Sequence, residues 1–257
     1  MACVRARQLI EPQRYEGRFI YKYGSCQHLE WLEPIILENR LYFPTPRELN
    51  DPAEARPPLT AASMDALIER LTLLTIERQP FLTSEGILRE ARTIRFNAPR
   101  FGTKMLLDSI AQSLYPNLET FHIYSLSKRP NNEHLWMRYA AKHTGYCLEF
   151  RNEGFFRAFE MRYSDVELDI TKRSQVQPFF LFYKTKAWRK EEEVRIIGHR
   201  NAGPTIAFEP QLLTRLILGK EITSANAAKI RAWACGRNPP PVVVEEREIT
   251  SAAAAKA

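Results

Sequence analysis

Three consecutive glutamates stand directly before a short apolar run in the segment YKTKAWRKEEEVRII (183–197). If a β-strand begins here, Glu191, Glu193 and Arg195 point to one face, because alternate side chains of a strand share a face. A carboxylate at the start of a strand can hold a sugar hydroxyl or act as a general base. Arg195 can hold Glu193 by a charge-assisted hydrogen bond and keep it ionised. The alternative is a solvated acidic turn with an ordinary surface ion pair.

Two other predicted strands carry polar side chains that could join such a site. In the motif YSLS, Ser125 and Ser127 share a face and can line a polar groove, although such serines also occur on solvent-facing strands. In the motif YKY, Lys22 lies on the face opposite to Tyr23. A lysine between aromatic residues can meet a phosphate as a point charge. It can equally be a surface lysine whose stem covers apolar neighbours.

Aromatic residues of HLWMRYAAKH supply a further candidate. Trp136, Tyr139 and His143 follow i, i+3, i+7 spacing, which places them on one stripe of a helix. A stripe that faces the core is the default interpretation, and a ring stacked on a nicotinamide or a nucleobase is the functional one. Trp188 is open to the same two interpretations.

Several common site types lack their motifs. The five histidines show no HExxH spacing, and GxSxG, Walker A and GxGxxG motifs are absent. The four cysteines form no CxxC pair, which disfavours a zinc site and fits a reducing compartment. A metal site built from Glu191, Glu193 and Asp51 is a weaker third hypothesis. We find no signal peptide and no membrane-spanning run, and therefore expect a cytoplasmic protein.

The chain has a basic balance. Its 257 residues contain 37 Lys and Arg against 30 Asp and Glu, which gives a net charge of +7. This excess favours a polyanionic partner such as nucleic acid, or a ligand that carries phosphate. The length suits one large domain, or one domain with an insertion.

The predicted elements place the candidate residues on strands around a helical block. Alternating apolar residues predict strands at 18–25, 120–130, 145–150 and 193–198, with further candidates at 160–170 and 178–185. Helical spacing predicts helices at 25–40, 132–143 and 224–235, and three more within 53–120. We predict a single α+β domain (1–250) with small, mostly antiparallel or mixed sheets around a cleft, a helical insertion (53–120) and a frayed tail (251–257).

Several of these segments, taken in order, resemble domain-of-unknown-function family 2971. The similarity includes IYKYGS, LYFPTPRELNDP, YSLSKRPNNEHLWMRYAAKHTGYCLEF, YKTKAWRKEEEVRI and LLTRLILGKEI, and spans roughly residues 19–235. The helical block is its variable part. Linked motifs in a fixed order are more specific than any one of them alone.

The layout of these motifs is similar to that of ADP-ribosyltransferases, which bind NAD in a cleft between small antiparallel sheets. The resemblance puts Lys22 at the basic residue of an early strand, Ser125–Ser127 at the Ser-Thr-Ser strand, and Glu191–Glu193 at the Glu-x-Glu motif. It implies that Glu193 binds the nicotinamide-ribose hydroxyl and that Glu191 contacts the acceptor. Two positions depart from the pattern: lysine replaces the usual arginine or histidine, and Leu126 replaces the central threonine.

Two functions follow as hypotheses. The first is an enzyme that uses NAD to modify a nucleic acid or a protein, in phage defence or as a toxin, with Glu193 and Glu191 as catalytic residues. The second is a module that binds a nucleotide or a partner without turnover. The residues predicted to contact NAD are Lys22, Tyr23, Ser125, Ser127, Trp136 and Tyr139.

Overall fold

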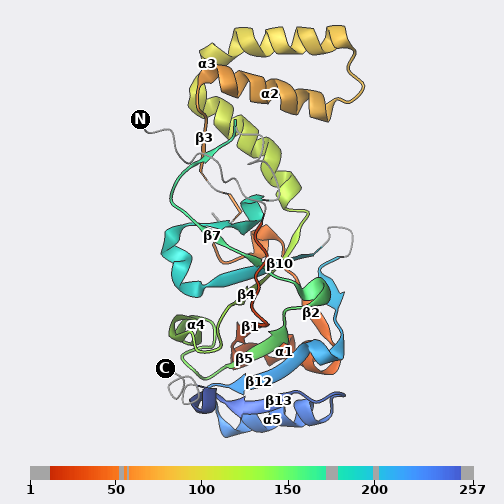
Figure 1. Cartoon of the computed structure of the whole chain (residues 1–257), viewed down its shortest axis with the longest axis vertical. Helices are drawn as coiled ribbons and strands as arrows, with labels where there is room; N and C mark the ends of the chain where they lie inside the picture. Colours follow the sequence, from red (N-terminus) through yellow and green to blue (C-terminus); the bar gives the residue numbers. More distant parts are fainter. Residues whose placement is uncertain (1–11, 52–54, 57, 172–178, 199–202, 250–257) are drawn as a thin grey trace.

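The computed structural model describes residues 12–51, 55–56, 58–171, 179–198 and 203–249. The tail predicted at 251–257 lies outside these residues. Within the described part, the chain is a mixed α/β structure, with a seven-stranded sheet in the body and two long helices extending from it (Figure 1).

The central sheet has the strand order β13-β12-β5-β1-β4-β10-β6. Its neighbours are antiparallel except for β12 and β13, which are parallel. Strands β5 and β10 are buried along almost their whole length, as expected for strands covered on both faces, and so do not alternate strictly between buried and exposed residues. The strands are β1 (Phe19–Gly24), β4 (His122–Ser127), β5 (Tyr146–Arg151), β6 (Phe159–Glu160), β10 (Glu193–Gly198), β12 (Leu213–Leu218) and β13 (Val242–Glu245).

The sheet has one weakly paired junction, between β1 and β4, which we call the seam. These two strands are paired only at Tyr21 and Ser127, whereas β1 pairs with β5, and β4 with β10, along six residue pairs each. Beyond the single pair, backbone groups at the seam need other partners. The sheets were predicted to be small, whereas seven strands join in one mixed sheet that three two-stranded sheets accompany.

Two apolar layers cover the sheet. On one face, helices α1 (Leu29–Leu37) and α5 (Ser224–Cys235) pack on the largest core cluster, which includes Ile20, Leu148 and Leu216. On the other face, the short helix α4 (Glu133–Arg138) packs against a smaller cluster. Residues of β1 alternate between these layers, so Ile20 and Tyr21 enter different cores.

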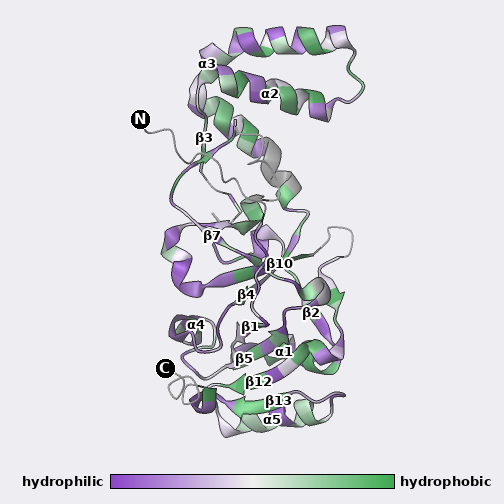
Figure 2. Ribbon diagram, viewed as in Figure 1, coloured by the Kyte–Doolittle hydropathy of each residue, from purple (hydrophilic) through white to green (hydrophobic). Residues whose placement is uncertain are grey.

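Helices α2 (Met64–Arg78) and α3 (Ser84–Leu118) form an arm at one end of the molecule (Figure 1). Three helices were predicted in this block, and the last two are merged into α3. Their boundary is a kink at Gly102, where the backbone has a φ of 73°, which glycine adopts readily. Hydrophilic and hydrophobic residues alternate along both helices (Figure 2), as expected for helices with one exposed side.

Short elements complete the body. The strand candidates at 160–170 and 178–185 contain only two-residue strands, because η5 (Phe179–Phe182) and irregular segments occupy most of them. The pairs are β2 (Arg40–Tyr42) with β11 (Thr205–Ala207), β3 (Leu59–Thr60) with β8 (Leu168–Asp169), and β7 (Arg162–Tyr163) with β9 (Tyr183–Lys184). Among the described helices, none is long and apolar enough to span a membrane.

Candidate active site at the seam of the sheet

A pocket of about 150 Å³ lies where the pairing of β1 and β4 ends. Segments far apart in the sequence meet there, and every predicted site residue except Trp136 belongs to its wall. The lining residues are Tyr21, Lys22, Tyr23, Leu49, Asn50, Ser125, Leu126, Ser127, Leu135, Tyr139, Lys184, Glu191 and Glu193.

A tight turn brings the two predicted catalytic glutamates into this pocket. The 3-10 helix η6 (Lys186–Glu191) ends at Glu192, whose left-handed φ of 46° reverses the chain before β10 starts at Glu193. The strand begins at Glu193 as predicted, and Glu191 reaches the pocket through the turn that precedes it. Ser127 Oγ donates a hydrogen bond of 3.1 Å to the Glu191 carbonyl, and the Glu193 amide donates one of 2.8 Å to the Tyr163 hydroxyl.

The turn formed by Glu191, Glu192 and Glu193 is mostly buried. Glu191 is 4% exposed and Glu193 is 3% exposed. Only Glu192, which is partly exposed, makes an ordinary surface ion pair, at 3.2 Å from Arg129. The solvated-turn interpretation is therefore wrong for the first and third glutamates.

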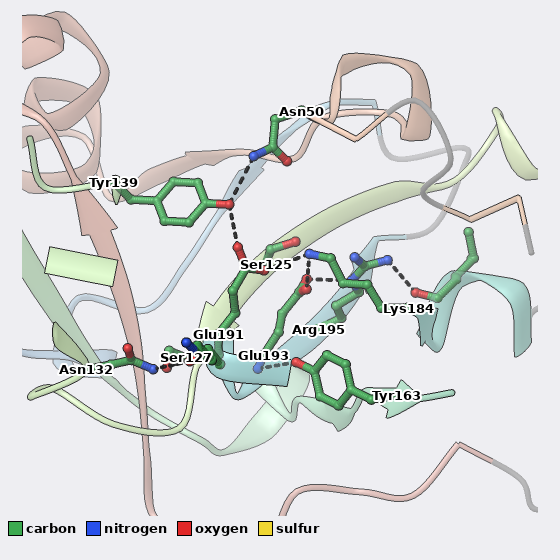
Figure 3. Close-up of polar contacts among 12 residues, drawn as sticks. Asn50, Ser125, Ser127, Asn132, Tyr139, Tyr163, Lys184, Glu191, Glu193 and Arg195 are labelled. Atoms are coloured by element: carbon green, nitrogen blue, oxygen red, sulfur yellow. Dashed lines mark hydrogen bonds and ion pairs between the residues drawn. The ribbon is translucent and has the colours of Figure 1, made fainter. Parts of the chain in front are cut away.

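A buried lysine joins the two catalytic candidates (Figure 3). Lys184 Nζ, positioned by β9, lies 2.7 Å from Glu191 Oε2 and 2.8 Å from Glu193 Oε2. Burial alone would lower the pKa of Lys184, but the attraction of Glu193 and Glu191 outweighs burial and raises it. Lys184 is therefore a fixed positive charge between two carboxylates.

Arg195 holds the other oxygen of Glu193, as predicted. Its Nε donates a 2.6 Å hydrogen bond to Glu193 Oε1, and its Nη1 donates one of 2.6 Å to the Leu181 carbonyl. Burial raises the pKa of Glu193 despite the opposing attraction of Lys184 and a hydrogen bond from Ser125. Desolvation disfavours the charged form of a carboxyl group more than these partners favour it.

Lys22 enters the pocket through the seam. By strand alternation it starts on the face opposite to the glutamates, and its ammonium donates a 3.0 Å hydrogen bond to the Ser125 carbonyl. It also lies 4.8 Å from the centre of the Tyr124 ring. Burial lowers the pKa of Lys22 to about 8, although Glu193 and Glu191 favour its charged form. Among the described residues, none makes an ion pair with Lys22, so its charge is available to an anionic ligand.

Tyr139, which caps the C-terminus of α4, completes the polar wall (Figure 3). Its hydroxyl donates a 2.6 Å hydrogen bond to Glu191 Oε1 and accepts one of 3.0 Å from Asn50 Nδ2. Burial and the bond to Glu191 raise the pKa of Tyr139 to about 12. The ring is therefore a neutral donor that orients Glu191.

Three predicted ligand contacts have structural roles. Trp136 is only 1% exposed, donates from Nε1 to the Pro130 carbonyl at 3.0 Å, and packs edge-on against Tyr23. The hydroxyl of Tyr23 donates to the Arg129 carbonyl at 2.7 Å, and the hydroxyl of Ser127 holds the acidic turn. Trp136 is thus a core residue, and Tyr23 and Ser127 line the pocket with their hydroxyl groups already engaged.

The prediction that Tyr139 and His143 continue a helical stripe from Trp136 is also wrong. Helix α4 ends at Arg138, and residues 141–143 have left-handed backbone conformations. His143 still stacks on Trp136, with ring centres 5.8 Å apart, but Tyr139 turns toward the pocket. Trp188 is half-buried, with the Arg138 guanidinium 4.5 Å from its ring centre.

The alternative metal site is not supported. Within the described part of the chain, the group whose ligand atoms come close enough for a metal ion consists of Glu133, His143 and Glu246. Its two carboxylates meet different nitrogens of the His143 ring, at 3.0 and 2.8 Å, and none of the three residues lines the pocket. Between Glu191 and Glu193, the ammonium of Lys184 takes the place that a cation would occupy.

Sequence reasoning missed Lys184 and Asn50. Lys184 precedes its partners by seven and nine residues, and a local pattern does not show that a turn will fold back on it. Asn50 lies in a proline-rich loop, where polar residues are common. The signal that could have identified both is their place within the motifs that carry the resemblance, YKTKAWRKEEEVRI and LYFPTPRELNDP.

Comparisons with known proteins add no assignment. A scan against protein-family models, a search of curated proteins and a search of solved structures found no match to this chain. The resemblance to family 2971 and to ADP-ribosyltransferases stays a prediction, carried by the motifs.

Proposed function

We propose that this pocket binds NAD and that the protein transfers ADP-ribose from NAD to a nucleic acid or a protein. A role in phage defence or as a toxin would suit such an activity. The observation that carries the proposal is the convergence of Lys22, Ser125 and Glu193, from three distant segments, on one pocket.

The charges suit cleavage of a glycosidic bond. In the proposed reaction, the bond between nicotinamide and the ribose C1′ breaks, its electron pair leaves with nicotinamide, and an acceptor oxygen or nitrogen attacks C1′. Positive charge develops on the ribose, and a fixed carboxylate such as Glu193 stabilises it. The acceptor loses a proton, for which Glu191 is the nearby base, and the proton is finally released to solvent.

The existing contacts of Glu193 leave room for a substrate hydroxyl. One oxygen binds Lys184 and the other binds Arg195. An ionised carboxylate offers about four acceptor positions, so a ribose hydroxyl can still donate to it. Lys184 and Arg195 would then fix the carboxylate in place, which reduces the reorganisation required in the transition state.

The pocket volume limits what it can enclose. About 150 Å³ is well below the ~300–1,000 Å³ of sites that bury a whole drug-sized ligand. We therefore propose that the pocket holds the nicotinamide-ribose end, while the rest of NAD lies over its open side. Lys22 is available there for a phosphate oxygen.

A binding module without turnover is the second candidate, and one observation favours it. Glu191, Glu193, Lys184 and Arg195 already satisfy one another without a ligand. Such a network can hold the turn before β10 for structural reasons alone, and the pocket would then recognise a nucleotide or a partner.

Nicotinamide release and label transfer from NAD distinguish the two candidates. We expect the unmodified protein to release nicotinamide and Glu193→Gln to lose at least about 100-fold of that rate, the scale seen when one stabilising group is removed. Glu192→Gln is the matched control, because Glu192 neighbours the site but does not line the pocket.

The outcomes separate the hypotheses as follows. If NAD binds but neither the unmodified protein nor Glu193→Gln releases nicotinamide, the binding module is favoured. If Glu192→Gln is as impaired as Glu193→Gln, the assignment of Glu193 is wrong. Circular dichroism of each variant shows whether the loss reflects unfolding.

A further inference from the structure

The arm carries a stripe of exposed basic and aromatic residues that the pocket does not use. Arg89, Arg92, Phe96 and Arg100 follow each other at intervals of three or four along α3, so they share one helix face. The opposite side of this helix packs Ala98 and Ile94 into a third apolar cluster, which also contains Ile123 of β4. We call these four exposed residues the basic stripe.

The basic stripe has unused charge and an exposed ring. Residues 88–105 contain five basic residues and one acidic residue. Arg95 pairs with Asp65 and Lys104 with Asp108, while Arg89, Arg92 and Arg100 make no ion pair within the described part of the chain. Phe96 is 67% exposed, with the Arg100 guanidinium 4.5 Å from its ring centre.

We propose that the basic stripe binds single-stranded nucleic acid. Guanidinium groups spaced along one face suit a row of phosphates, and an exposed phenyl ring offers a surface on which an unpaired base can stack. The guanidinium of Arg100 adds a second stacking plane beside the ring. Phe101, which is 52% exposed, follows Arg100 directly and lies next to the kink at Gly102.

The observations favour this partner over others. A duplex would satisfy the arginines but would leave Phe96 without an unpaired base. An anionic membrane surface is favoured by a continuous apolar face opposite the charges, whereas Phe96 lies among the arginines and the opposite face is packed in the core. The stripe lies outside the pocket lining, so this inference does not depend on NAD chemistry.

Fluorescence anisotropy with the full chain and a labelled 20-nucleotide poly(U) RNA tests the proposal. We expect binding at about 50 mM salt that weakens as salt rises. Replacing Arg89, Arg92 and Arg100 together by Gln should weaken binding at least tenfold and reduce the salt slope by about 2, since each phosphate contact contributes about 0.7. A control triple replaces the exposed arginines of the body, Arg18, Arg157 and Arg162, by Gln and should change binding less than threefold.

Variants of Phe96 test the stacking contact separately. Phe96→Leu keeps an apolar residue but removes the ring, and should weaken RNA binding about five- to hundredfold, whereas Phe96→Trp should preserve it. Equal losses for the two arginine triples, or a Phe96→Leu variant that binds normally, would overturn the proposal. So would binding to vesicles containing phosphatidylserine but not to RNA, or tighter binding to a duplex of the same length.

Discussion

The pocket and the arm use charge in opposite ways. At the pocket, Lys184, Glu191 and Glu193 in the wall and Arg195 behind it are almost completely buried, and each is held by an oppositely charged partner at 2.6–2.8 Å. Along the basic stripe, three arginines are exposed and lack such partners within the described residues. Burial fixes the geometry of a charge at a high desolvation cost, while exposure leaves a charge free to meet a partner from solution.

This difference gives the two regions different sensitivities. Removing one buried partner leaves the others uncompensated, so the pocket should affect stability and ligand binding together. Removing one exposed charge should leave the fold unchanged and affect only a partner that binds there. Four predictions test this contrast, in order of decreasing expected effect.

The largest effect is expected for Lys184→Met. It leaves Glu191 and Glu193 adjacent without their shared cation, and should lower the free energy of unfolding by ~3–5 kcal/mol, measured by urea denaturation at pH 7. Protonation relieves carboxylate repulsion, so the deficit should shrink as the pH falls. Lys186→Met, at an exposed lysine two residues away, should change stability by less than ~0.5 kcal/mol. A similar loss in both variants would contradict the importance of the buried network.

The second effect concerns Lys22 and pH. Since its pKa is lowered to about 8, its positive charge is present below that pH and is lost as the pH rises through it. Affinity for ADP-ribose, measured by calorimetry between pH 6.5 and 9.5, should therefore fall above about pH 8. Lys22→Gln should remove ~1.5–3 kcal/mol of binding free energy at pH 7.

The matched variant is Lys22→Arg, whose guanidinium stays charged over this range. It should bind with little change between pH 7 and 9.5. If it loses affinity with the same pH profile as the unmodified protein, another group is responsible for the titration.

Two aromatic variants test whether Trp136 belongs to the core and Tyr139 to the pocket. Trp136→Phe loses the bond to the Pro130 carbonyl and should cost ~1–2 kcal/mol of stability without changing ADP-ribose affinity. Tyr139→Phe loses the bond to Glu191 and should weaken ADP-ribose binding by ~0.5–1.5 kcal/mol. If Trp136→Phe weakened ADP-ribose binding and Tyr139→Phe did not, Trp136 rather than Tyr139 would contact the ligand.

The smallest effect is expected in the arm. Arg92→Gln should change the free energy of unfolding by less than ~0.5 kcal/mol and leave ADP-ribose affinity unchanged, because its side chain is exposed and has no ion pair among the described residues. Thermal unfolding and calorimetry measure the two quantities. If this variant lost ADP-ribose binding, the arm would affect the pocket, and the two regions would not act independently.

The sequence was sufficient for the strands that carry the motifs and for the face that their residues share. Ser125 and Ser127 do lie beside Arg195 and Glu193 in the ladder of β4 and β10, because strand alternation is local information. Lys22, Glu191 and Glu193 also converge as the resemblance implied.

What the sequence could not provide depends on long-range contacts. Lys184 became a partner only because η6 folds back on β9, and Glu191 enters the pocket through a turn rather than a strand. Trp136 satisfied the spacing of a ligand-binding stripe, but tertiary packing placed it in the core. Helical spacing in the arm was recognised, and the two helices predicted on either side of Gly102 are the two halves of α3, because the backbone of Gly102 is not helical.

The central claim is that the pocket at the seam holds the nicotinamide-ribose end of NAD against Glu193. Saturation-transfer difference NMR of NAD with the unmodified protein and with Glu193→Gln tests it most directly. We predict the strongest transfer to the nicotinamide and its ribose protons, with a marked reduction in the variant. Strongest transfer to the adenine protons, or no transfer at all, would contradict the account.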